Sequence, residues 1–351
     1  MNSKHTNIRI GISMGDPNGI GMEVIIKTFN DSRILDFYTP IIYGSSKITN
    51  FYRKSLQLYD ISFHQIKKED DAQSKRLNLI NCGDENMQIE PGNATEISGE
   101  YAYNCLKMAC NGLKNRKIDV LITAPINKLT IKKNIDDFIG HTEYLGKNFK
   151  GNPLMLMVSD YMKIALVTTH IPVTEIKKNL CENDVYHKIQ LLNKTLVQDF
   201  GINKPKIAVL GLNPHAGEGG MLGNEEEKII IPAIEKSKEN KVLAFGPYPA
   251  DSFFTDRNLK AFDAILAMYH DQGLTPFKTL SFNNGVNYTA GLNIIRTSPI
   301  HGTAYEIAGK NKANEQSFRE AIYLACDIFK QRKHSSQIAN TKNNLKSEKI
   351  K

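Results

Sequence analysis

Three expected strands in this chain are each followed closely by a histidine, and this pattern constrains the fold more than any other feature. Residues 264–268 lead into His270, residues 166–169 into His170, and residues 208–212 into His215. Buried parallel strands carry their ligand-binding groups at their carboxyl ends, because helices cover the sheet faces and the connecting loops stay accessible. The sequence therefore predicts buried parallel strands whose three histidines could converge on one metal ion.

Expected strands and helices alternate along the whole chain, which is typical of the α/β class with largely parallel sheets. The expected strands are residues 8–13, 40–43, 118–122, 154–158, 163–169, 206–212 and 264–268. The expected helices are residues 22–29, 95–113, 225–236 and 315–330. With 351 residues, the chain is too long for one small core and suits two domains.

Both ends of the ordered chain are expected to belong to one domain. We expect that domain to comprise residues 1–135 and 285–334, with residues 136–284 forming a central domain that carries the metal site and the dimer contact. The polar residues 335–351 are expected to form a disordered tail.

Composition excludes several classes of protein. No run of eighteen apolar residues is present, so no membrane span is expected, and the amino terminus lacks the apolar core of a secretory signal. The five cysteines contain no C-x-x-C pair, which favours reduced thiols in the cytoplasm. The net charge of +8 comes from scattered lysines without a basic stripe, so we expect no nucleic-acid partner and at most attraction of an anionic, phosphorylated substrate.

Two glycine-containing turns are candidate anion sites, but each has a purely structural alternative. Residues 15–21 (Gly-Asp-Pro-Asn-Gly-Ile-Gly) lie between a strand and a helix, where backbone N–H groups can bind an anion. They do not form the G-x-G-x-x-G fingerprint, so a tight strand-to-helix turn explains them equally well. Gly140 is followed by His141 and Thr142, which could hold a phosphate or a carboxylate, or could simply begin a helix.

The three strand-end histidines suit a catalytic metal. Three neutral imidazoles bind a divalent ion, zinc most naturally, and leave coordination positions open for a substrate. Asp251 and Asp271 could orient the imidazoles or take a proton. Lys278 and Arg296 could grip a phosphate or carboxylate, and Asn287 can both donate and accept hydrogen bonds. The alternative for each histidine is a polar side chain satisfied by the backbone at the start of a loop.

The order of several motifs resembles the 4-hydroxythreonine-4-phosphate dehydrogenase family of vitamin B6 biosynthesis. The motifs are Gly-Asp-Pro-Asn-Gly-Ile-Gly at 15–21, Thr-Ala-Pro-Ile-Asn-Lys at 123–128, Gly-His-Thr-Glu-Tyr-Leu at 140–145, Asn-Pro-His-Ala-Gly-Glu at 213–218, Gly-Pro-Tyr-Pro-Ala-Asp at 246–251 and Tyr-His-Asp-Gln-Gly at 269–273. Residues 301–314 are similar to the adenosine-binding loop of isocitrate and isopropylmalate dehydrogenases. The resemblance implies their fold, with two α/β/α domains and a cleft between them.

The resemblance also implies a role for individual residues. The implied metal ligands are His170, His215 and His270; the implied substrate-binding residues are His141, Thr142, Lys278, Asn287 and Arg296; and the implied cofactor-binding residues are His301, Gly302, Thr303, Ala304 and Asn314. Asp251, Asp271 and Lys278 are the candidate catalytic groups. The family implies a homodimer whose site is completed by the second subunit, and we expect His270 to be the ligand that crosses.

The implied reaction is a metal-dependent oxidation of 4-phosphohydroxy-L-threonine by NAD or NADP, with zinc, magnesium or cobalt as the metal. The resulting 3-oxo acid loses carbon dioxide and gives 3-amino-2-oxopropyl phosphate. One alternative keeps this chemistry and changes the substrate to threonate or erythronate phosphate. A metal-dependent hydrolase is a second alternative, but no H-E-x-x-H motif is present and residues 301–314 would then have no role.

Overall fold

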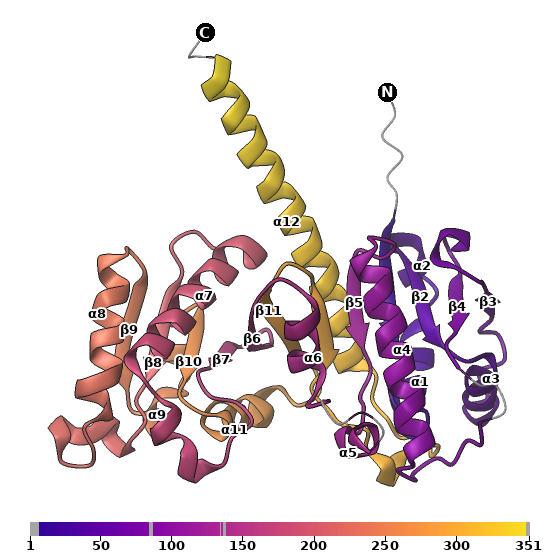
Figure 1. Ribbon diagram of the computed structural model, residues 1–351, viewed down its shortest axis with the longest axis horizontal. Coiled ribbons are helices and arrows are strands. Elements are labelled where there is room, and N and C mark those ends of the chain that lie inside the picture. The colour runs from indigo at the N-terminus through magenta and orange to yellow at the C-terminus, as the bar shows by residue number, and fades with distance from the viewer. Residues whose placement is uncertain (1–6, 84–86, 134, 136–137, 349–351) are drawn as a thin grey trace. The chain divides into compact units, whose positions relative to one another are not determined.

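The computed structural model describes residues 7–83, 87–133, 135 and 138–348, with side chains up to residue 337. The chain divides into two compact units (Figure 1). Each unit has its own hydrophobic core. Unit 1 comprises Met1–Gly151, Val286–Tyr288 and Leu292–Cys326, and unit 2 comprises Asn152–Gly285, Thr289–Gly291 and Asp327–Lys351. Both units are of the α/β class with largely parallel strands, which confirms the predicted fold class.

Unit 1 is built on a sheet with the strand order β3-β4-β2-β1-β5-β12-β11. Its strands are β1 (Ile8–Ser13), β2 (Tyr38–Gly44), β3 (Phe63–Gln65), β4 (Leu77–Asn81), β5 (Val120–Thr123), β11 (Val286–Leu292) and β12 (Arg296–Pro299). All neighbouring pairs are parallel except β11 with β12. Strand β2 is buried at all seven positions, as a strand must be when helices cover both faces of its sheet.

The helices of unit 1 follow from caps and apolar faces that the sequence supplies. They are α1 (Gly21–Phe29), α2 (Ile34–Phe37), α3 (Ser46–Ser55), α4 (Glu96–Lys114), α5 (Lys128–Lys132), α6 (His141–Asn148) and the first part of α12 (Gln316–Glu348). Helix α4 begins at a capping box, in which Thr95 and Ser98 each accept the other's backbone N–H. It packs on β1, β2 and β5 and buries Cys105 and Cys110 in the core.

Unit 2 is built on a sheet with the strand order β6-β7-β10-β8-β9. Its strands are β6 (Gly151–Val158), β7 (Lys163–Leu166), β8 (Lys206–Leu210), β9 (Leu243–Tyr248) and β10 (Ala264–Ala267). Its helices are α7 (Glu182–Phe200), α8 (Ile231–Glu239), α9 (Ala250–Phe253), α10 (Asp256–Ala261) and α11 (His270–Ser281). Strands β7, β10, β8 and β9 are parallel, and only β6 runs antiparallel to its neighbour.

Helix α11 packs directly on β7 and β10 because its fourth residue is a glycine. A Cβ atom at Gly273 would stand 2.8 Å from Leu166 Cδ2 and 2.9 Å from Ile164 Cγ2, closer than real Cβ contacts. Any larger residue there would therefore force the side chains of Leu166 and Ile164, or the helix itself, to shift. This close packing fixes the start of α11, where His270 lies.

The compact units divide the chain at other positions than the expected domains, and unit 1 ends at Cys326, where residue 334 was expected. The first boundary falls after Gly151, whereas residue 135 was expected, so α6 belongs to unit 1. Residues 335–348 continue helix α12, whereas a disordered tail was expected from residue 335. The sequence offers neither glycine nor proline after residue 330 to end the helix, and its Lys, Gln, Asn and Ser residues are all tolerated in a helix. Residues 349–351 lie outside the described chain.

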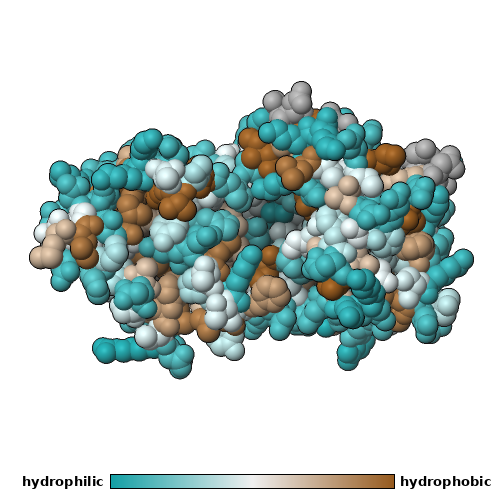
Figure 2. All heavy atoms as spheres, turned by 90° about the horizontal axis from the view of Figure 1, so that it is seen from below, coloured by the Kyte–Doolittle hydropathy of each residue, from teal (hydrophilic) through white to brown (hydrophobic). Residues whose placement is uncertain are grey.

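The exposed surface does not indicate a membrane span. Hydrophobic residues are interspersed among hydrophilic ones on the face drawn in Figure 2. Among the described residues, no helix combines the length and the apolar character needed to cross a bilayer.

Candidate active site

The three predicted metal-binding histidines follow three adjacent strands of unit 2. Strand β10 lies between β7 and β8 and is parallel to both, so the carboxyl ends of these strands meet at one edge of the sheet. His270 begins the helix that follows β10, His170 follows β7, and His215 lies in the loop after β8. The three histidines thus follow adjacent parallel strands at one edge of the sheet, as the sequence pattern predicts, and their role as metal ligands stays a prediction.

Hydrogen bonds fix the loops at this edge to one another. The Thr168 backbone N and Oγ1 both donate to the Met268 carbonyl, at 3.1 and 2.8 Å, which joins the loops after β7 and β10. The buried Gln272 side chain accepts from Met268 N at 2.7 Å and donates to the Gly211 carbonyl at 2.6 Å. Gln272 thus connects the start of α11 to the end of β8. A buried amide with both ends satisfied holds its neighbours in a single arrangement.

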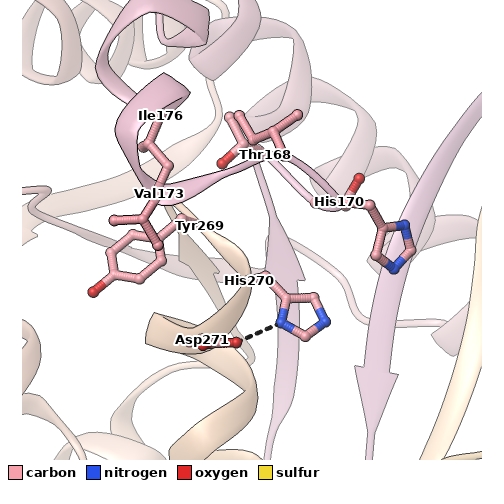
Figure 3. A pocket seen from close by; sticks show the side chains of 9 residues that line it. Thr168, His170, Val173, Ile176, Tyr269, His270 and Asp271 are labelled. Carbon is pink, nitrogen blue, oxygen red and sulfur yellow. Dashed lines mark hydrogen bonds and ion pairs between the residues drawn. The ribbon is translucent and has the colours of Figure 1, made fainter.

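His170 and His270 line a pocket of about 200 Å³ in unit 2. Their ring centroids are 5.7 Å apart, and Figure 3 shows both imidazoles on one side of the pocket, with Val173, Ile176 and Tyr269 on the other. The His270 Nδ1 atom lies 2.7 Å from Asp271 Oδ1. A carboxylate at Nδ1 favours the tautomer in which the Nε2 lone pair is available, as is usual for metal-binding histidines.

His215 lies in an irregular loop, the 3₁₀ segment η4 (Pro214–Gly220), and its side chain is exposed. The backbone is left-handed from His215 to Gly219, with φ between 45° and 82°. Such a run is costly for residues other than glycine, and strained backbone of this kind is often found at functional sites. The loop therefore needs specific contacts to hold it.

The buried carboxylate of Glu226 supplies those contacts. Its Oε1 accepts hydrogen bonds from the backbone N–H groups of Leu212 and Asn213, both at 2.7 Å, and its Oε2 accepts from Asn213 Nδ2 at 2.8 Å. Glu226 begins a π-helical turn, η5 (Glu226–Ile230), a rare element that often marks functional sites.

The neighbouring Glu225 adds a second anchor for the same loop. Its Oε2 accepts from Asn213 Nδ2 at 2.8 Å, and its Oε1 pairs with Lys177 Nζ at 2.6 Å. Lys177 first and Asn213 second lower the pKa of the Glu225 carboxyl to about 2. Glu225 is therefore ionised at neutral pH and holds the loop by charge-assisted hydrogen bonds.

The histidines of one chain meet only some of the requirements of a metal site. Two facing imidazoles, one of them oriented by a carboxylate, have the donor chemistry that zinc prefers, with bonds of about 2.0–2.1 Å. Across the part of the chain that the structure describes, however, no three His, Cys, Asp or Glu side chains are close enough to hold one ion. One chain brings His170 and His270 together and leaves His215 apart, so the three-histidine assignment stays a prediction.

Unit 1 contains a cluster of hydrogen-bond donors around Arg296, which lies on β12 and is 2% exposed. The guanidinium donates through Nε and Nη2 to Thr123 Oγ1, at 3.0 and 2.6 Å, at the carboxyl end of β5. Burial lowers the pKa of Arg296 to about 10, so it remains a cation at neutral pH. A buried cation at a strand end suits an anionic group such as a phosphate or carboxylate.

His141, the first residue of α6, lies close to this cation. Burial first, and then the charges of Arg296 and Lys128, hold the pKa of His141 well below its usual 6.5. Its Nε2 atom is buried without a hydrogen-bond partner, and so is the Asn287 Oδ1 atom on β11. Buried polar atoms normally find partners, so two such atoms in the predicted substrate set are consistent with a ligand that would satisfy them.

The depressed pKa of His141 predicts a loss of stability in mild acid. Below about pH 6.5, the unfolded chain binds a proton at this imidazole that the folded chain does not bind, so the free energy of unfolding falls as the pH decreases towards the folded pKa. The His141→Asn variant should lose less stability than the parent between about pH 7 and pH 5. Urea denaturation across that range measures both slopes, and identical slopes would contradict the assignment. Arg296, Lys128 and Glu143, the charged groups around the imidazole, are unchanged in the variant.

The predicted cofactor segment, residues 301–314, lies against the glycine-rich turn of unit 1. Ile20 N donates to the Thr303 carbonyl at 3.0 Å, which joins the start of α1 to this segment. Its other end is held by Glu23, whose Oε1 accepts from Ala313 N at 2.9 Å. Asn314 Oδ1 accepts from Gln316 N at 2.8 Å, so this residue caps the start of α12. His301 Nε2 is buried without a partner, and Gly302 has open space beside it.

The remaining predicted residues lie at the surface. Lys278 on α11 and Asp251 on α9 are exposed in unit 2, and Asp271 is 76% exposed although it contacts His270. Thr142 is half-buried beside His141 on α6. The predicted substrate set is therefore divided, with Lys278 in unit 2 and the other members in unit 1.

Four residues that contact candidate site residues or their loops were not predicted as site residues: Asp16 and Lys128 in unit 1, and Glu226 and Gln272 in unit 2. Lys128 ends the Thr-Ala-Pro-Ile-Asn-Lys motif, and its side chain lies beside Gly140 together with that of Glu143. Asp16 lies in the motif at residues 15–21 and Gln272 in the motif at residues 269–273. A charged or amide residue inside a glycine-containing motif could therefore have indicated both as site residues. Glu226 had none, because one glutamate among the three at 225–227 cannot be singled out from sequence.

Comparison with known proteins identifies the family. Residues 36–325 match the model of the family described as pyridoxal phosphate biosynthetic protein PdxA, and the chain belongs to this family. It is 48% identical over 331 residues to the 4-hydroxythreonine-4-phosphate dehydrogenase of Bacteroides thetaiotaomicron, covering 94% of this chain and 91% of that protein. It is 39% identical over 324 residues to a protein of Oceanobacillus iheyensis provisionally named a D-threonate 4-phosphate dehydrogenase, covering 91% and 97%.

The fold agrees with this assignment. The crystal structure of 4-hydroxythreonine-4-phosphate dehydrogenase from Klebsiella pneumoniae superimposes with a TM-score of 0.78 at 32% identity. The match covers 94% of this chain and 99% of that one. Both α/β units therefore have counterparts in a solved member of the family.

Proposed function

We propose that this protein oxidises 4-phosphohydroxy-L-threonine with NAD or NADP, in the biosynthesis of pyridoxal 5'-phosphate. The hydride passes from the substrate to the nicotinamide and a proton is released, which gives a 3-oxo acid. Loss of carbon dioxide from that acid yields 3-amino-2-oxopropyl phosphate. The main support is the 48% identity, over 94% of the chain, to a 4-hydroxythreonine-4-phosphate dehydrogenase.

The donor cluster of unit 1 supports binding of the phosphorylated substrate. Arg296 is a buried cation whose guanidinium is fixed by Thr123, and His141 presents a neutral imidazole with an unpartnered Nε2. Together with Thr142 and Asn287, these groups can donate hydrogen bonds to the substrate and accept hydrogen bonds from it. Residues 301–304 and Asn314 are the proposed cofactor-binding residues.

The histidines of unit 2 support a divalent metal ion, with zinc first and magnesium or cobalt as alternatives. When bound, such an ion supplies Lewis-acid stabilisation of negative charge on a substrate oxygen. Asp271 orients the His270 imidazole through Nδ1, which leaves Nε2 for a ligand bond. Lys278 and Asp251, both exposed on the helices after β10 and β9, are the proposed groups for proton transfer.

A homodimer is part of the proposal, because one chain does not bring three ligands together among its described residues. In the proposed dimer, His170 and His215 of one chain are joined by His270 of the partner subunit. Exposed apolar side chains in unit 2 are consistent with a partner surface: Tyr161 is 61% exposed and Phe282 is 61% exposed. The proposed location is the cytoplasm, where the five free cysteines would stay reduced.

Turnover with purified protein tests the proposal. Each of NAD and NADP is combined with 4-phosphohydroxy-L-threonine, D-threonate 4-phosphate or erythronate 4-phosphate, and the absorbance of the reduced cofactor is followed. We expect turnover with 4-phosphohydroxy-L-threonine and none with the same compound lacking its phosphate. Turnover of D-threonate 4-phosphate alone would favour the second candidate, which the 39% identity to the Oceanobacillus iheyensis protein supports.

The Arg296→Lys variant should discriminate against the phosphorylated substrate. Lysine keeps the charge but cannot present two N–H donors to Thr123 Oγ1 in a fixed plane, so the cation loses its fixed position. We expect KM for the phosphorylated substrate to rise roughly 10- to 100-fold, the usual range for a hydrogen bond to a charged group. KM for NAD or NADP should change by less than about threefold. Steady-state kinetics measure both constants.

Arg319→Lys is the matched control for that variant. Arg319 lies on α12 and donates to Glu315 Oε1 at 3.0 Å, outside the proposed site. It should leave both KM values close to those of the parent chain. Equal losses for substrate and cofactor in Arg296→Lys would count against a substrate-binding role for Arg296.

A further inference from the structure

Asp16 lies at the centre of a buried polar cluster in unit 1 to which the sequence analysis gave no role. Its side chain is fully buried and accepts hydrogen bonds from Asn18 N at 2.9 Å, Ser98 Oγ at 3.2 Å and Tyr305 Oη at 2.7 Å. Its backbone N donates to the Pro125 carbonyl at 2.8 Å. Asp16 thus connects the glycine-rich turn to α4, to the loop after β5 and to residues 301–314.

Tyr305 is the member of this cluster that belongs to the proposed cofactor segment. It begins the 3₁₀ turn η6 (Tyr305–Ile307), directly after Ala304, whose backbone is left-handed with φ 45°. Its Oη donates the shortest of the three hydrogen bonds to Asp16. Burial raises the pKa of the Asp16 carboxyl, and the bond from Tyr305 is the largest opposing effect. Tyr305 therefore does more than the other donors to stabilise this buried carboxylate.

The position of Tyr305 along the segment explains why this bond matters. Ile20 N holds the Thr303 carbonyl, and Glu23 and Lys27 hold Ala313 through its N–H and carbonyl. Gly19 allows the close approach, because a Cβ there would stand 2.9 Å from the Thr303 carbonyl oxygen. Between Thr303 and Ala313, the Tyr305–Asp16 bond is a side-chain contact that joins the segment to the glycine-rich turn.

The same region has room and polar atoms for a ligand. Nothing lies within 4 Å of a Cβ placed on Gly302, and the neighbouring His301 Nε2 is buried without a partner. Both residues precede the point at which Tyr305 fixes the chain. A shift of the segment at Tyr305 would therefore move the groups that could contact a bound dinucleotide.

We propose that Tyr305 is a positioning residue for the dinucleotide: its hydrogen bond to Asp16 holds residues 301–314 against the glycine-rich turn in the conformation that binds NAD or NADP. Tyr305 acts through Asp16 and need not touch the dinucleotide itself. This inference rests on the proposed function, because it takes the cofactor role of residues 301–314 from there.

The test compares Tyr305→Phe with Tyr52→Phe. Tyr52 on α3 donates its hydroxyl to the Pro17 and Gly19 carbonyls, at 2.9 and 3.1 Å. Each variant removes one tyrosine hydroxyl that donates a hydrogen bond to the glycine-rich turn. Only Tyr305 belongs to the proposed cofactor segment. Calorimetric titration with NAD and with NADP, and steady-state kinetics with the phosphorylated substrate, are measured on the parent chain and on both variants.

Tyr305→Phe should raise Kd and KM for the dinucleotide about tenfold, as expected when a hydrogen bond to a charged group is lost. KM for the phosphorylated substrate and kcat should each change by less than about twofold. Tyr52→Phe should leave Kd and KM for the dinucleotide within about twofold of the parent, whatever it does to thermal stability. Asp16→Asn keeps an acceptor for the Tyr305 hydroxyl, so it should raise Kd for the dinucleotide less than Tyr305→Phe does. The double variant should have the same Kd as Tyr305→Phe alone.

Hydrogen exchange of the backbone amides gives a readout that does not depend on activity. Exchange in residues 303–312 should be faster in Tyr305→Phe than in the parent chain and in Tyr52→Phe. Parent-like Kd and exchange in Tyr305→Phe, or equal changes in the two tyrosine variants, would overturn the inference. If the parent chain binds neither NAD nor NADP, the proposed function fails, and faster exchange in Tyr305→Phe alone would still support the structural part of the inference.

Discussion

The His215→Ala variant is expected to bind no divalent metal ion at the site and to lose turnover by a factor on the order of 10³ or more. Lewis-acid catalysis supplies several kcal/mol to reactions of this kind, and each 1.4 kcal/mol corresponds to a factor of ten in rate. The fold should survive, because the side chain is exposed and the loop is held by Glu226 through the backbone of Leu212 and Asn213. Metal content by mass spectrometry and turnover with the phosphorylated substrate measure the two losses.

His187→Ala is the matched control for this variant. His187 is an exposed histidine on α7 of the same unit, and its ring contacts Tyr186, not the candidate site. It should retain metal and turnover. A fully active His215→Ala variant that retains its metal would refute the ligand assignment of His215.

Several strands and helices could be predicted from the sequence because their apolar periodicity is strong. Residues 8–13 form β1 with the predicted bounds, and the helix predicted at 95–113 is α4, Glu96–Lys114. The predicted helix at 225–236 combines a π-helical turn with α8, Ile231–Glu239. Apolar periodicity reports which residues face the core, but it does not distinguish a π-helical turn from an α-helical one.

The strand edge of the candidate site was also predictable, because three buried strands ended in polar residues. Adjacency of β7, β10 and β8 then follows from their parallel pairing. The distance between the side chains could not follow from that pattern. His170 lies four residues after Leu166 and His270 three residues after Ala267, whereas His215 lies five residues after Leu210 and is the first residue of a left-handed run of backbone.

Contacts between residues far apart in sequence could not be predicted, for a different reason. Tyr305 and Asp16 are 289 positions apart, and each is an ordinary residue in its own segment. Gln272 contacts Gly211, 61 positions away, through a buried amide. Neither pair has a spacing that a single sequence can reveal, because the fold, not the local pattern, brings the partners together.

A dimer with shared sites predicts that two inactive variants can restore activity to each other. If His270 of the partner subunit joins His170 and His215 of one chain, a mixed dimer of His170→Ala and His270→Ala chains has one site with both lesions and one intact site. Random mixing gives half mixed dimers, each with one working site out of two, so about a quarter of parent activity should return. The variants are purified separately, dissociated, mixed and reassociated before turnover is measured.

The choice of variant pairs identifies which histidine crosses between subunits. Mixing His215→Ala with His270→Ala should also restore activity. Mixing His170→Ala with His215→Ala should not, because one chain supplies both of these ligands to a site, so each site of the mixed dimer lacks one of them. The rings of His170 and His270 are 5.7 Å apart within one chain, so a site in which one chain supplies these two histidines and the partner subunit supplies His215 is also physically reasonable. Restoration by His170→Ala with His215→Ala, and none by His170→Ala with His270→Ala, would assign His215 as the crossing ligand. Failure of every pair, in dimers shown by light scattering to have formed, would contradict the shared site itself.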